Sequence, residues 1–316
     1  MPRRLLALAA LMLAFAAQPA LAKDKLVLLL DWFVNPDHGP IILAEELGYF
    51  EEAGLEVEVI APADPSEPPK LVAAGRADLA VSYQVQLHLQ VAEGLPIAWV
   101  GTLVATPLNC LLVLEDGPIK EISDLKDGKI GFSVAGVEEV LLGAILEKHG
   151  VALSDIDLIN VNFALSPALM TEQVDAVIGA YRNFELNQMD IEGVPGRCFY
   201  IEEEGLPAHD ELIYVAKPDI DAEKKDAIAR FLEATEKATQ YIVNHPEESW
   251  EIFKGTAAEL DDELNKRAWP DTIPRFALRP GAIDPGRYKR FDAFMVDRGL
   301  VETPNSISRL LLNVHE

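Results

Sequence analysis

Three side chains suited to binding a small molecule follow the first apolar run of the sequence. Trp32 offers an aromatic face, Asn35 an amide and His38 an imidazole. Aromatic faces stack on flat groups, whereas amides and imidazoles donate and accept hydrogen bonds. Because the run at 25–31 has the composition of a buried strand, we predict that its carboxyl end delivers these side chains to a binding cleft. Purely structural roles are also open, in the core for Trp32 and as an anchor at a helix start for His38.

Two further strand-like runs end in tyrosines. The segments 75–83 and 172–181 each pass from a helix end through an apolar run to Tyr83 and Tyr181. Ligands in open α/β sheets bind outside the carboxyl ends of strands, so both rings are predicted to face one crevice. Pattern alone equally allows two rings that merely cap hydrophobic strand ends. Glu185 begins the next helical run, where a carboxylate also favours the helix dipole without any ligand.

Short apolar runs alternate with helical patterns along most of the chain, which predicts α/β structure with helices on both faces of parallel sheets. Strands are expected at 25–31, 55–61, 78–82, 97–103, 129–133, 158–162, 174–179, 198–201 and 211–217. Helices are expected at 38–50, 69–74, 83–93, 137–149 and 167–172, and then at 222–244, 246–254, 258–268 and 285–297.

The strands form two series, which indicates two lobes. About 290 residues follow the N-terminal export signal, more than one hydrophobic core usually organises. We expect the C-terminal helices to pack on the first lobe, so that the chain crosses between lobes twice. The expected division is a first lobe of 23–108 and 215–316, a second lobe of 109–214, and a two-strand hinge.

The first 22 residues have the three parts of a secretory signal peptide. Arg3 and Arg4 form the basic start, 5–17 form the apolar stretch, and Ala20-Leu21-Ala22 forms a small-residue cleavage site. The apolar stretch is short for a bilayer span, so a retained membrane anchor is the weaker interpretation. We predict cleavage after Ala22, and a soluble periplasmic protein with no stable membrane anchor.

The formal net charge of −25 predicts repulsion of nucleic acid and anionic lipid. Solubility is its simplest explanation, although the charge also makes a neutral or basic ligand more natural than an anionic one. Cys110 and Cys198 permit one disulfide in an oxidising compartment. Both lie in strand-like runs, where free cysteine acts as a small buried hydrophobe, and that interpretation is favoured over pairing. Neither has the spacing of a metal ligand or the context of a thiol enzyme.

Several short motifs follow one another between residues 29 and 103. They are Asp31-Trp32 with Asn35, Pro36 and His38, then Gly48-Tyr49-Phe50, Ala53-Gly54-Leu55, Asp64-Pro65-Ser66, and Gly75 with Ala77-Asp78. Their order and spacing resemble the family of periplasmic binding proteins and enzymes for thiamine pyrimidine precursors, which is grouped with the sulfonate-binding proteins of ABC importers. The resemblance implies a type II periplasmic binding fold.

Two later segments, 82–88 and 179–185, resemble the bacterial branch that captures N-formyl-4-amino-5-aminomethyl-2-methylpyrimidine, a thiamine breakdown product, for an ABC importer. This resemblance implies a binding protein without catalytic residues, metal or cofactor, and an importer permease as its partner. The expected ligand-binding residues are Trp32, Asn35, His38, Ser82, Tyr83, Ser133, Tyr181, Asn183 and Glu185. Asp31 and Asn109 are weaker candidates.

An aminopyrimidine needs a stacking wall and a hydrogen-bond partner for the ring edge that bears its amine. Trp32, Tyr83 and Tyr181 can supply aromatic faces. Glu185 can accept from the amine and form a charge-assisted pair with a protonated ring nitrogen, and Asn35 suits the remaining ring nitrogen or the formamide.

The same family contains a synthase branch that makes the pyrimidine from its own histidine and bound pyridoxal phosphate. This chain keeps His38 at the matching place but has Ser82 where that branch has the cofactor lysine, and 207–210 where it has an iron-binding cysteine cluster. Without the amine no Schiff base forms, so we expect His38 to contact the ligand or anchor a loop. A sulfonate or taurine binder and a binder of a riboflavin-like heterocycle are the rival binding functions, and a pyrimidine synthase is the less favoured rival of a different class.

Overall fold

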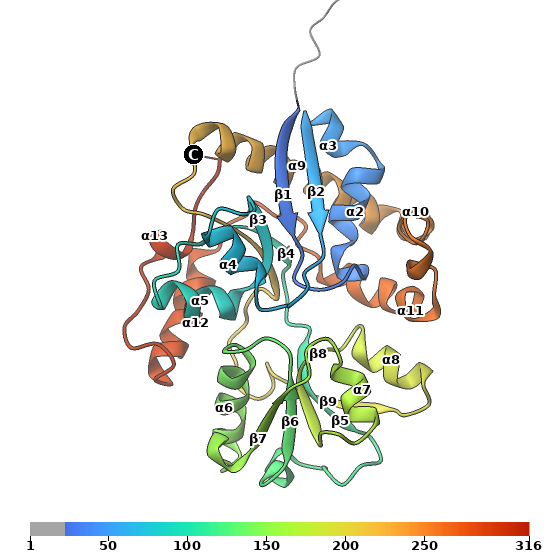
Figure 1. The fold of residues 1–316 in the computed structure, drawn as a ribbon, viewed down its shortest axis with the longest axis vertical. Coiled ribbons are helices and arrows are strands. Elements are labelled where there is room, and N and C mark those ends of the chain that lie inside the picture. Colours follow the sequence, from blue (N-terminus) through green and yellow to red (C-terminus); the bar gives the residue numbers. More distant parts are fainter. Residues whose placement is uncertain (1–22, 316) are drawn as a thin grey trace, which may run out of the picture.

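The computed structural model describes residues 23–315, which form two five-stranded sheets with helices packed around them (Figure 1). The predicted signal peptide lies outside the described residues. The strand order is β2-β1-β3-β10-β4 in the first sheet and β7-β6-β8-β5-β9 in the second. The predicted α/β class is confirmed, and each sheet with its helices is called a lobe below.

The first sheet consists of β1 (Asp24–Leu29), β2 (Leu55–Ile60), β3 (Leu79–Tyr83), β4 (Ala98–Val104) and β10 (Leu212–Ala216). β1 pairs in parallel with β2 and β3, whereas β10 runs antiparallel to β3 and β4. Strands β3, β4 and β10 are buried along their whole length, which explains why they appear in the sequence as continuous apolar runs.

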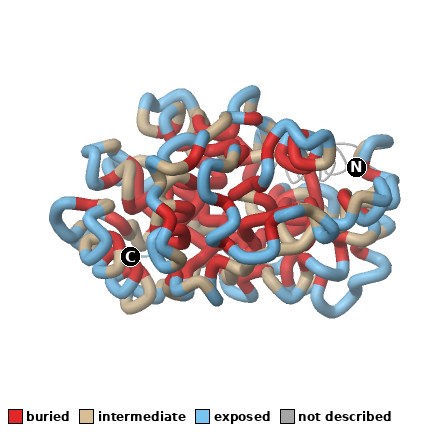
Figure 2. Tube along the Cα trace, turned by 90° about the horizontal axis from the view of Figure 1, so that it is seen from below, coloured by how far each residue is buried: buried red, intermediate tan, exposed pale blue. Residues whose placement is uncertain are grey.

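The second sheet repeats this arrangement with β5 (Asn109–Leu114), β6 (Lys129–Phe132), β7 (Asp157–Asn160), β8 (Ala176–Tyr181) and β9 (Gly196–Tyr200). β6 pairs in parallel with β7 and β8, and β5 runs antiparallel to β8 and β9. In both lobes, buried residues fill the interior, and exposed ones lie on the outer helices and loops (Figure 2).

The helices cover both lobes. Those of the first lobe are α2 (Gly39–Glu46), α3 (Tyr49–Glu52), α4 (Pro68–Ala73) and α5 (Gln84–Ala92), and those of the second are α6 (Glu138–Lys148), α7 (Leu165–Met170) and α8 (Glu185–Ile191). The C-terminal helices are α9 (Ala222–Asn244), α10 (Pro246–Lys254), α11 (Glu263–Thr272), α12 (Pro285–Asp297) and α13 (Ile307–Leu310). Short 3-10 helices are η1 (Pro36–His38), η2 (Ile122–Leu125), η3 (Leu153–Asp155), η4 (Ala258–Leu260) and η5 (Ile273–Arg275).

The C-terminal helices pack mainly on the first lobe (Figure 1). In α9, Arg230 Nη2 donates to Asp24 Oδ2 at 2.5 Å. After α13, Leu312 N donates to Trp99 O of β4 at 2.8 Å. No helix among residues 23–315 is both long enough and apolar enough to cross a membrane.

Two predicted helices are divided in the structure. The helix expected at 258–268 is η4 followed by α11, because the side chain of Asp262 accepts from Asn265 N and caps a new helix start. The helix expected at 38–50 is split into η1, α2 and α3. Gly48 lies between α2 and α3 with φ of 74°, a left-handed conformation that favours glycine.

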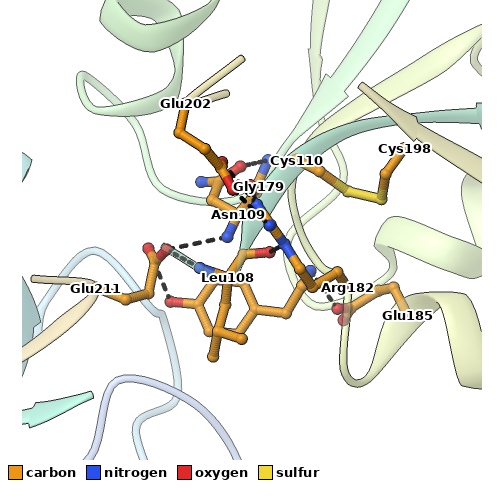
Figure 3. Close-up of a disulfide and its surroundings, with 10 residues drawn as sticks. Leu108, Asn109, Cys110, Gly179, Arg182, Glu185, Cys198, Glu202 and Glu211 are labelled. Atoms are coloured by element: carbon orange, nitrogen blue, oxygen red, sulfur yellow. Dashed lines mark hydrogen bonds and ion pairs between the residues drawn. A yellow bond between two sulfur atoms is a disulfide. The ribbon is translucent and has the colours of Figure 1, made fainter. Parts of the chain in front are cut away.

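The chain crosses between the sheets from β4 to β5 and returns from β9 to β10. Glu211, at the return crossing, ties the two connections together. Its Oε2 accepts from Leu108 N at 2.6 Å and from Asn109 N at 2.9 Å (Figure 3). This carboxyl group therefore joins the two segments about which the lobes would move.

The structure pairs Cys110 with Cys198, which corrects the favoured interpretation of two free thiols. Their Cα atoms are 5.6 Å apart on the neighbouring strands β5 and β9 (Figure 3). The sequence separation of 88 residues hid this proximity, because it depends on the antiparallel pairing of the two strands.

Candidate functional site

A cavity lies between the lobes, where the loop after β1 meets the carboxyl ends of β3, β6 and β8. Four acidic side chains line it: Asp31, Asp37, Glu138 and Glu185. Its aromatic lining residues are Trp32, Tyr83, Tyr181 and Phe184, and its amides are Asn35 and Asn109. Among the described residues no lysine or arginine lines this cavity. Its wall is therefore aromatic and acidic, without a lysine or arginine to balance the acids.

Glu138 and Glu185 occupy equivalent places in the second lobe. Each is the first residue of the helix that follows a strand, α6 after β6 and α8 after β8. Oε2 of Glu185 accepts from Tyr181 N at 2.6 Å. Oε2 of Glu138 accepts from Ser133 N at 2.5 Å and from Val134 N at 3.1 Å. Within residues 23–315 no other residue donates to either Oε1 atom, so each Oε1 is left for a ligand, and Oε2 of Glu185 has only one donor from another residue and can accept a second.

Three of the four acids on the cavity wall, Asp37, Glu138 and Glu185, hold their protons unusually well. Burial raises the pKa of Glu185 and of Glu138 to about 8, although backbone N–H donors oppose the shift. Burial also raises the pKa of Asp37 to about 7, against the opposing effects of His38 and Asn183. At neutral pH these carboxyls can therefore both donate and accept hydrogen bonds in the empty cavity.

Asp31 links two of the predicted site residues. Its Oδ2 accepts from Tyr83 OH at 2.9 Å, and its Oδ1 lies 3.0 Å from His38 Nε2. The other ring nitrogen of His38, Nδ1, accepts from Asn35 N at 3.3 Å, which places the proton on Nε2. Both nitrogens of this fully buried ring are therefore occupied by the protein, and His38 anchors the loop after β1.

The Asn35 side chain likewise forms hydrogen bonds with the local backbone. Its Oδ1 accepts from Asp37 N at 2.8 Å, and its Nδ2 donates to Phe33 O at 3.2 Å. It thereby caps η1 and directs the buried carboxyl of Asp37 to the cavity. Asn183, from the second lobe, donates through Nδ2 to Asp37 Oδ1 and to Thr272 Oγ1, both at 2.7 Å. This amide joins the two lobes beside the cavity.

An aromatic cluster borders the cavity at the junction of the lobes. Trp32 packs edge-on against Phe163, with ring centroids 4.6 Å apart, and Phe33 lies 5.9 Å from Phe184. Trp32 and Phe33 come from the first lobe, whereas Phe163 and Phe184 come from the second. The half-buried Trp32 ring therefore both lines the cavity and contacts the opposite lobe.

The structure brings most of the expected site residues together. Those on the cavity wall are Trp32, Asn35, His38, Tyr83, Ser133, Tyr181 and Glu185. Ser82 and Asn183 are not on the wall. The side chain of Ser82 turns into the first lobe, where its Oγ donates to Gln86 Oε1 at 2.8 Å.

Sequence reasoning missed seven wall residues: Asp37, Val134, Val137, Glu138, Leu165, Gly179 and Phe184. For the two acids the available signal was position, since Asp37 directly precedes His38, and Glu138 begins a helix after a strand as Glu185 does.

The site does not fit the pyridoxal phosphate of the synthase branch. The side chain at position 82 carries no amine and does not reach the cavity, and no lysine of the described chain lines it. No group of three or more histidine, cysteine, aspartate or glutamate side chains within residues 23–315 is arranged to hold a metal ion.

The fold is that of type II periplasmic binding proteins, as solved structures show. The periplasmic aliphatic sulphonate binding protein SsuA of Escherichia coli superposes with a TM-score of 0.67, at 16% identity and with 92% of each chain covered. A Candida albicans protein described as having the generic periplasmic binding protein fold superposes with a TM-score of 0.72, at 17% identity, covering 93% of this chain and 97% of its own. The two-lobed class predicted from the sequence is thus confirmed.

Residues 35–249 match the NMT1/THI5-like family, and the chain belongs to it. A Haemophilus influenzae protein described as a thiamine biosynthesis protein is 50% identical over 90% of both chains. The formylaminopyrimidine-binding protein of Halalkalibacterium halodurans is 30% identical, over 73% of this chain and 70% of its own. A Legionella pneumophila relative, 24% identical over 81% of both chains, is a 4-amino-5-hydroxymethyl-2-methylpyrimidine phosphate synthase. The family thus includes proteins named for binding and proteins named for synthesis.

Proposed function

We propose that this protein is the substrate-binding component of an ABC importer and captures N-formyl-4-amino-5-aminomethyl-2-methylpyrimidine, or a close aminopyrimidine, for thiamine salvage. It is exported by its signal peptide, binds the ligand in the periplasm between its two lobes, and presents the closed form to the importer permease. It carries out no chemistry on the ligand.

The observation that carries the proposal is the composition of the cavity wall. Four carboxyl side chains and four aromatic rings surround the space, and no lysine or arginine of the described residues joins them. A flat ring that bears an amine matches both features, because its faces stack and its edge donates. A sulfonate would place a permanent negative charge in a cavity where no lysine or arginine of the described residues compensates it, which disfavours the taurine-like ligand.

Glu185 is the proposed partner of the aminopyrimidine edge. With a pKa of about 8, its carboxyl holds a proton at neutral pH and can give it to the ring nitrogen while accepting from the amine. This two-point contact persists whether the shared proton sits on the carboxyl or on the ring. Its strength is about 1.5–3 kcal/mol for each charge-assisted bond.

Tyr83 and Tyr181 are proposed as fixed walls for the ring. The Tyr83 hydroxyl donates to Asp31, and the Tyr181 hydroxyl donates to Glu211 Oε1 at 3.4 Å. Burial raises the pKa of both hydroxyls, so both remain protonated donors throughout the physiological range. Rings held at both ends lose little freedom when a ligand stacks on them.

The closed form rests on contacts between the lobes. Besides the Asn183 bridge, Arg267 Nη1 lies 2.6 Å from Asp190 Oδ2, and Arg298 Nη1 lies 2.7 Å from Glu147 Oε2. These two ion pairs are largely exposed and contribute little by themselves. Ligand bound between the lobes would add its own contacts to these and to the aromatic cluster, and the permease would recognise the resulting closed form.

The test is a panel of ligands added to the purified mature protein and followed by calorimetry. The panel contains the formylated aminopyrimidine, its hydroxymethyl analogue, riboflavin and taurine. We expect the two aminopyrimidines to bind, and binding of taurine or riboflavin alone would overturn the ligand class. Release of a pyrimidine product when iron and pyridoxal phosphate are supplied would support a synthase instead.

A second experiment tests export. We expect the protein in the periplasmic fraction of the producing bacterium, with its amino terminus at Lys23. An unprocessed chain retained in the cytoplasm would contradict the transport role.

A further inference from the structure

The Glu138 carboxyl accepts hydrogen bonds from backbone N–H groups in the loop that precedes α6. Its Oε2 atom accepts from Ser133 N and Val134 N, and the residue is only 4% exposed. Both N–H groups lie in the loop between β6 and α6, and successive backbone N–H groups in such a strand-to-helix loop can bind a phosphate, sulfonate or carboxylate group. In this chain a carboxyl group of the protein itself occupies that site.

The absence of a side chain at Gly179 leaves room for the Glu138 carboxyl in this position. A Cβ atom at Gly179 would lie 1.9 Å from Oε1 and 2.6 Å from Cδ of Glu138, and its φ of +96° also favours glycine. The backbone N of Gly179 donates to Asn109 Oδ1 at 3.1 Å, so β8 is held where it stands (Figure 3). The Glu138 side chain is consequently packed between the start of α6 and β8, with one oxygen on the cavity wall.

We propose that Glu138 is a specificity-determining residue, which makes the cavity accept an unphosphorylated aminopyrimidine and reject ligands that carry a phosphate or sulfonate group. The proposal rests on the proposed function and adds the charge of the ligand to it. A tetrahedral anion would find the N–H groups of Ser133 and Val134 already used, and no lysine or arginine of the described residues lines the desolvated space to compensate its charge. An uncharged amine-bearing ligand would instead meet the free Oε1 of Glu138 as an acceptor.

The fold itself does not impose this choice, since a structural neighbour with the same fold is named as an aliphatic sulphonate binding protein. Within the family, one relative is named as the synthase of a pyrimidine phosphate. The hydroxymethyl aminopyrimidine and its phosphate ester are therefore a matched pair of probes, because they differ only in the group that Glu138 is proposed to exclude.

The experiment measures the dissociation constants of this pair by calorimetry for the wild type, Glu138→Ala, Glu138→Gln and the control Glu139→Gln. Glu139 is the next residue of α6, and its carboxylate accepts from Gly136 N away from the cavity lining. We expect the wild type to prefer the alcohol over its phosphate by about 100-fold or more, because the phosphate would lose its hydration in a cavity that offers it neither a cation nor the two backbone donors. Glu138→Ala should cut this preference at least tenfold by tightening phosphate binding, since it frees two backbone donors.

The Glu138→Gln variant cannot ionise but keeps an acceptor for both N–H groups, so its preference should lie between those of the wild type and Glu138→Ala. The Glu139→Gln control should match the wild type. Equal binding of alcohol and phosphate by the wild type, or an unchanged preference in folded Glu138→Ala, would overturn the role of Glu138 while leaving aminopyrimidine binding intact. If Glu138→Ala does not fold, the wild type and Glu138→Gln decide. Absence of binding by either probe and by the formylated ligand would refute the proposed function itself, and the role of Glu138 with it.

Discussion

Replacing Glu185 by glutamine tests the hydrogen-bonding core of the proposed site. The substitution keeps the shape of the side chain, and the amide oxygen can still accept from Tyr181 N, as Glu185 Oε2 does now at 2.6 Å. The amide nitrogen then occupies the place of Oε1 on the cavity wall. A donor would face the amine of the ligand, and the exchangeable proton would be lost.

The size of the effect follows from the kind of bond that is lost. Glu185 is 7% exposed, so its contact with a ligand is shielded from water. One charge-assisted hydrogen bond contributes about 1.5–3 kcal/mol, which corresponds to a rise in the dissociation constant of roughly 10-fold to 150-fold. The free energy of unfolding of the empty protein should not fall along with the affinity. Burial raises the pKa of this carboxyl to about 8, and an amide carries no charge to desolvate, so the empty variant should be at least as stable as the wild type above that pH.

The assay combines calorimetry with the formylated aminopyrimidine and urea denaturation of the empty protein. Glu192→Gln is the matched control. It is the same substitution at the other end of α8, where Glu192 is exposed and is not part of the cavity lining. This control variant should leave both the dissociation constant and the free energy of unfolding unchanged. An unaltered dissociation constant in Glu185→Gln would remove Glu185 from the ligand contact. Weaker binding together with an equal loss of stability would assign it a structural role instead.

Three further predictions concern the remaining parts of the molecule. Trp32→Ala should abolish most of the ligand-induced change in tryptophan fluorescence, because Trp32 is the tryptophan that lines the cavity, and a full signal in the variant would contradict its contact with the ligand. Reduction of the Cys110–Cys198 disulfide should lower the free energy of unfolding by about 2–4 kcal/mol, since it frees a long loop of the unfolded chain; urea denaturation measures this, with the double alanine variant as a control that should not respond to reductant. The free energy of unfolding of the empty protein should fall as the pH rises from about 6.5 to about 8.5, because the folded chain retains protons on Asp37 and Glu138 that the unfolded chain has already lost. A rise over that interval in pH-dependent denaturation would refute the protonated state of these carboxyls.

Local patterns determined the strand ends that form the site. The apolar runs before Tyr83 and Tyr181 predicted strands whose carboxyl ends face one crevice, and both tyrosines line the cavity. Glu185 was found in the same way, as the first residue of a helix after a strand. These predictions succeed because burial imposes a short-range periodicity on the sequence, and because the edge of a sheet at which a parallel strand ends is fixed by its direction.

Several side chains were misplaced because their directions depend on packing between distant segments. Ser82 precedes Tyr83 on the same strand, and successive residues of a strand point to opposite faces, so Ser82 bonds to Gln86 inside the lobe. Asn183 lies beside the expected site residues in the sequence, yet its amide bridges to Asp37 and α11 of the other lobe.

The sequence by itself determined the α/β class, the two series of strands and the acidic, aromatic character of the residues at the strand ends, since all of these depend on composition and short-range periodicity. Only the tertiary structure decided which residues meet. The antiparallel pairing of β5 with β9 joins the two cysteines, and the approach of Gly179 to α6 holds Glu138 on the cavity wall. Such contacts join segments far apart in the chain, and their existence depends on how the sheets and helices pack rather than on any local pattern of residues.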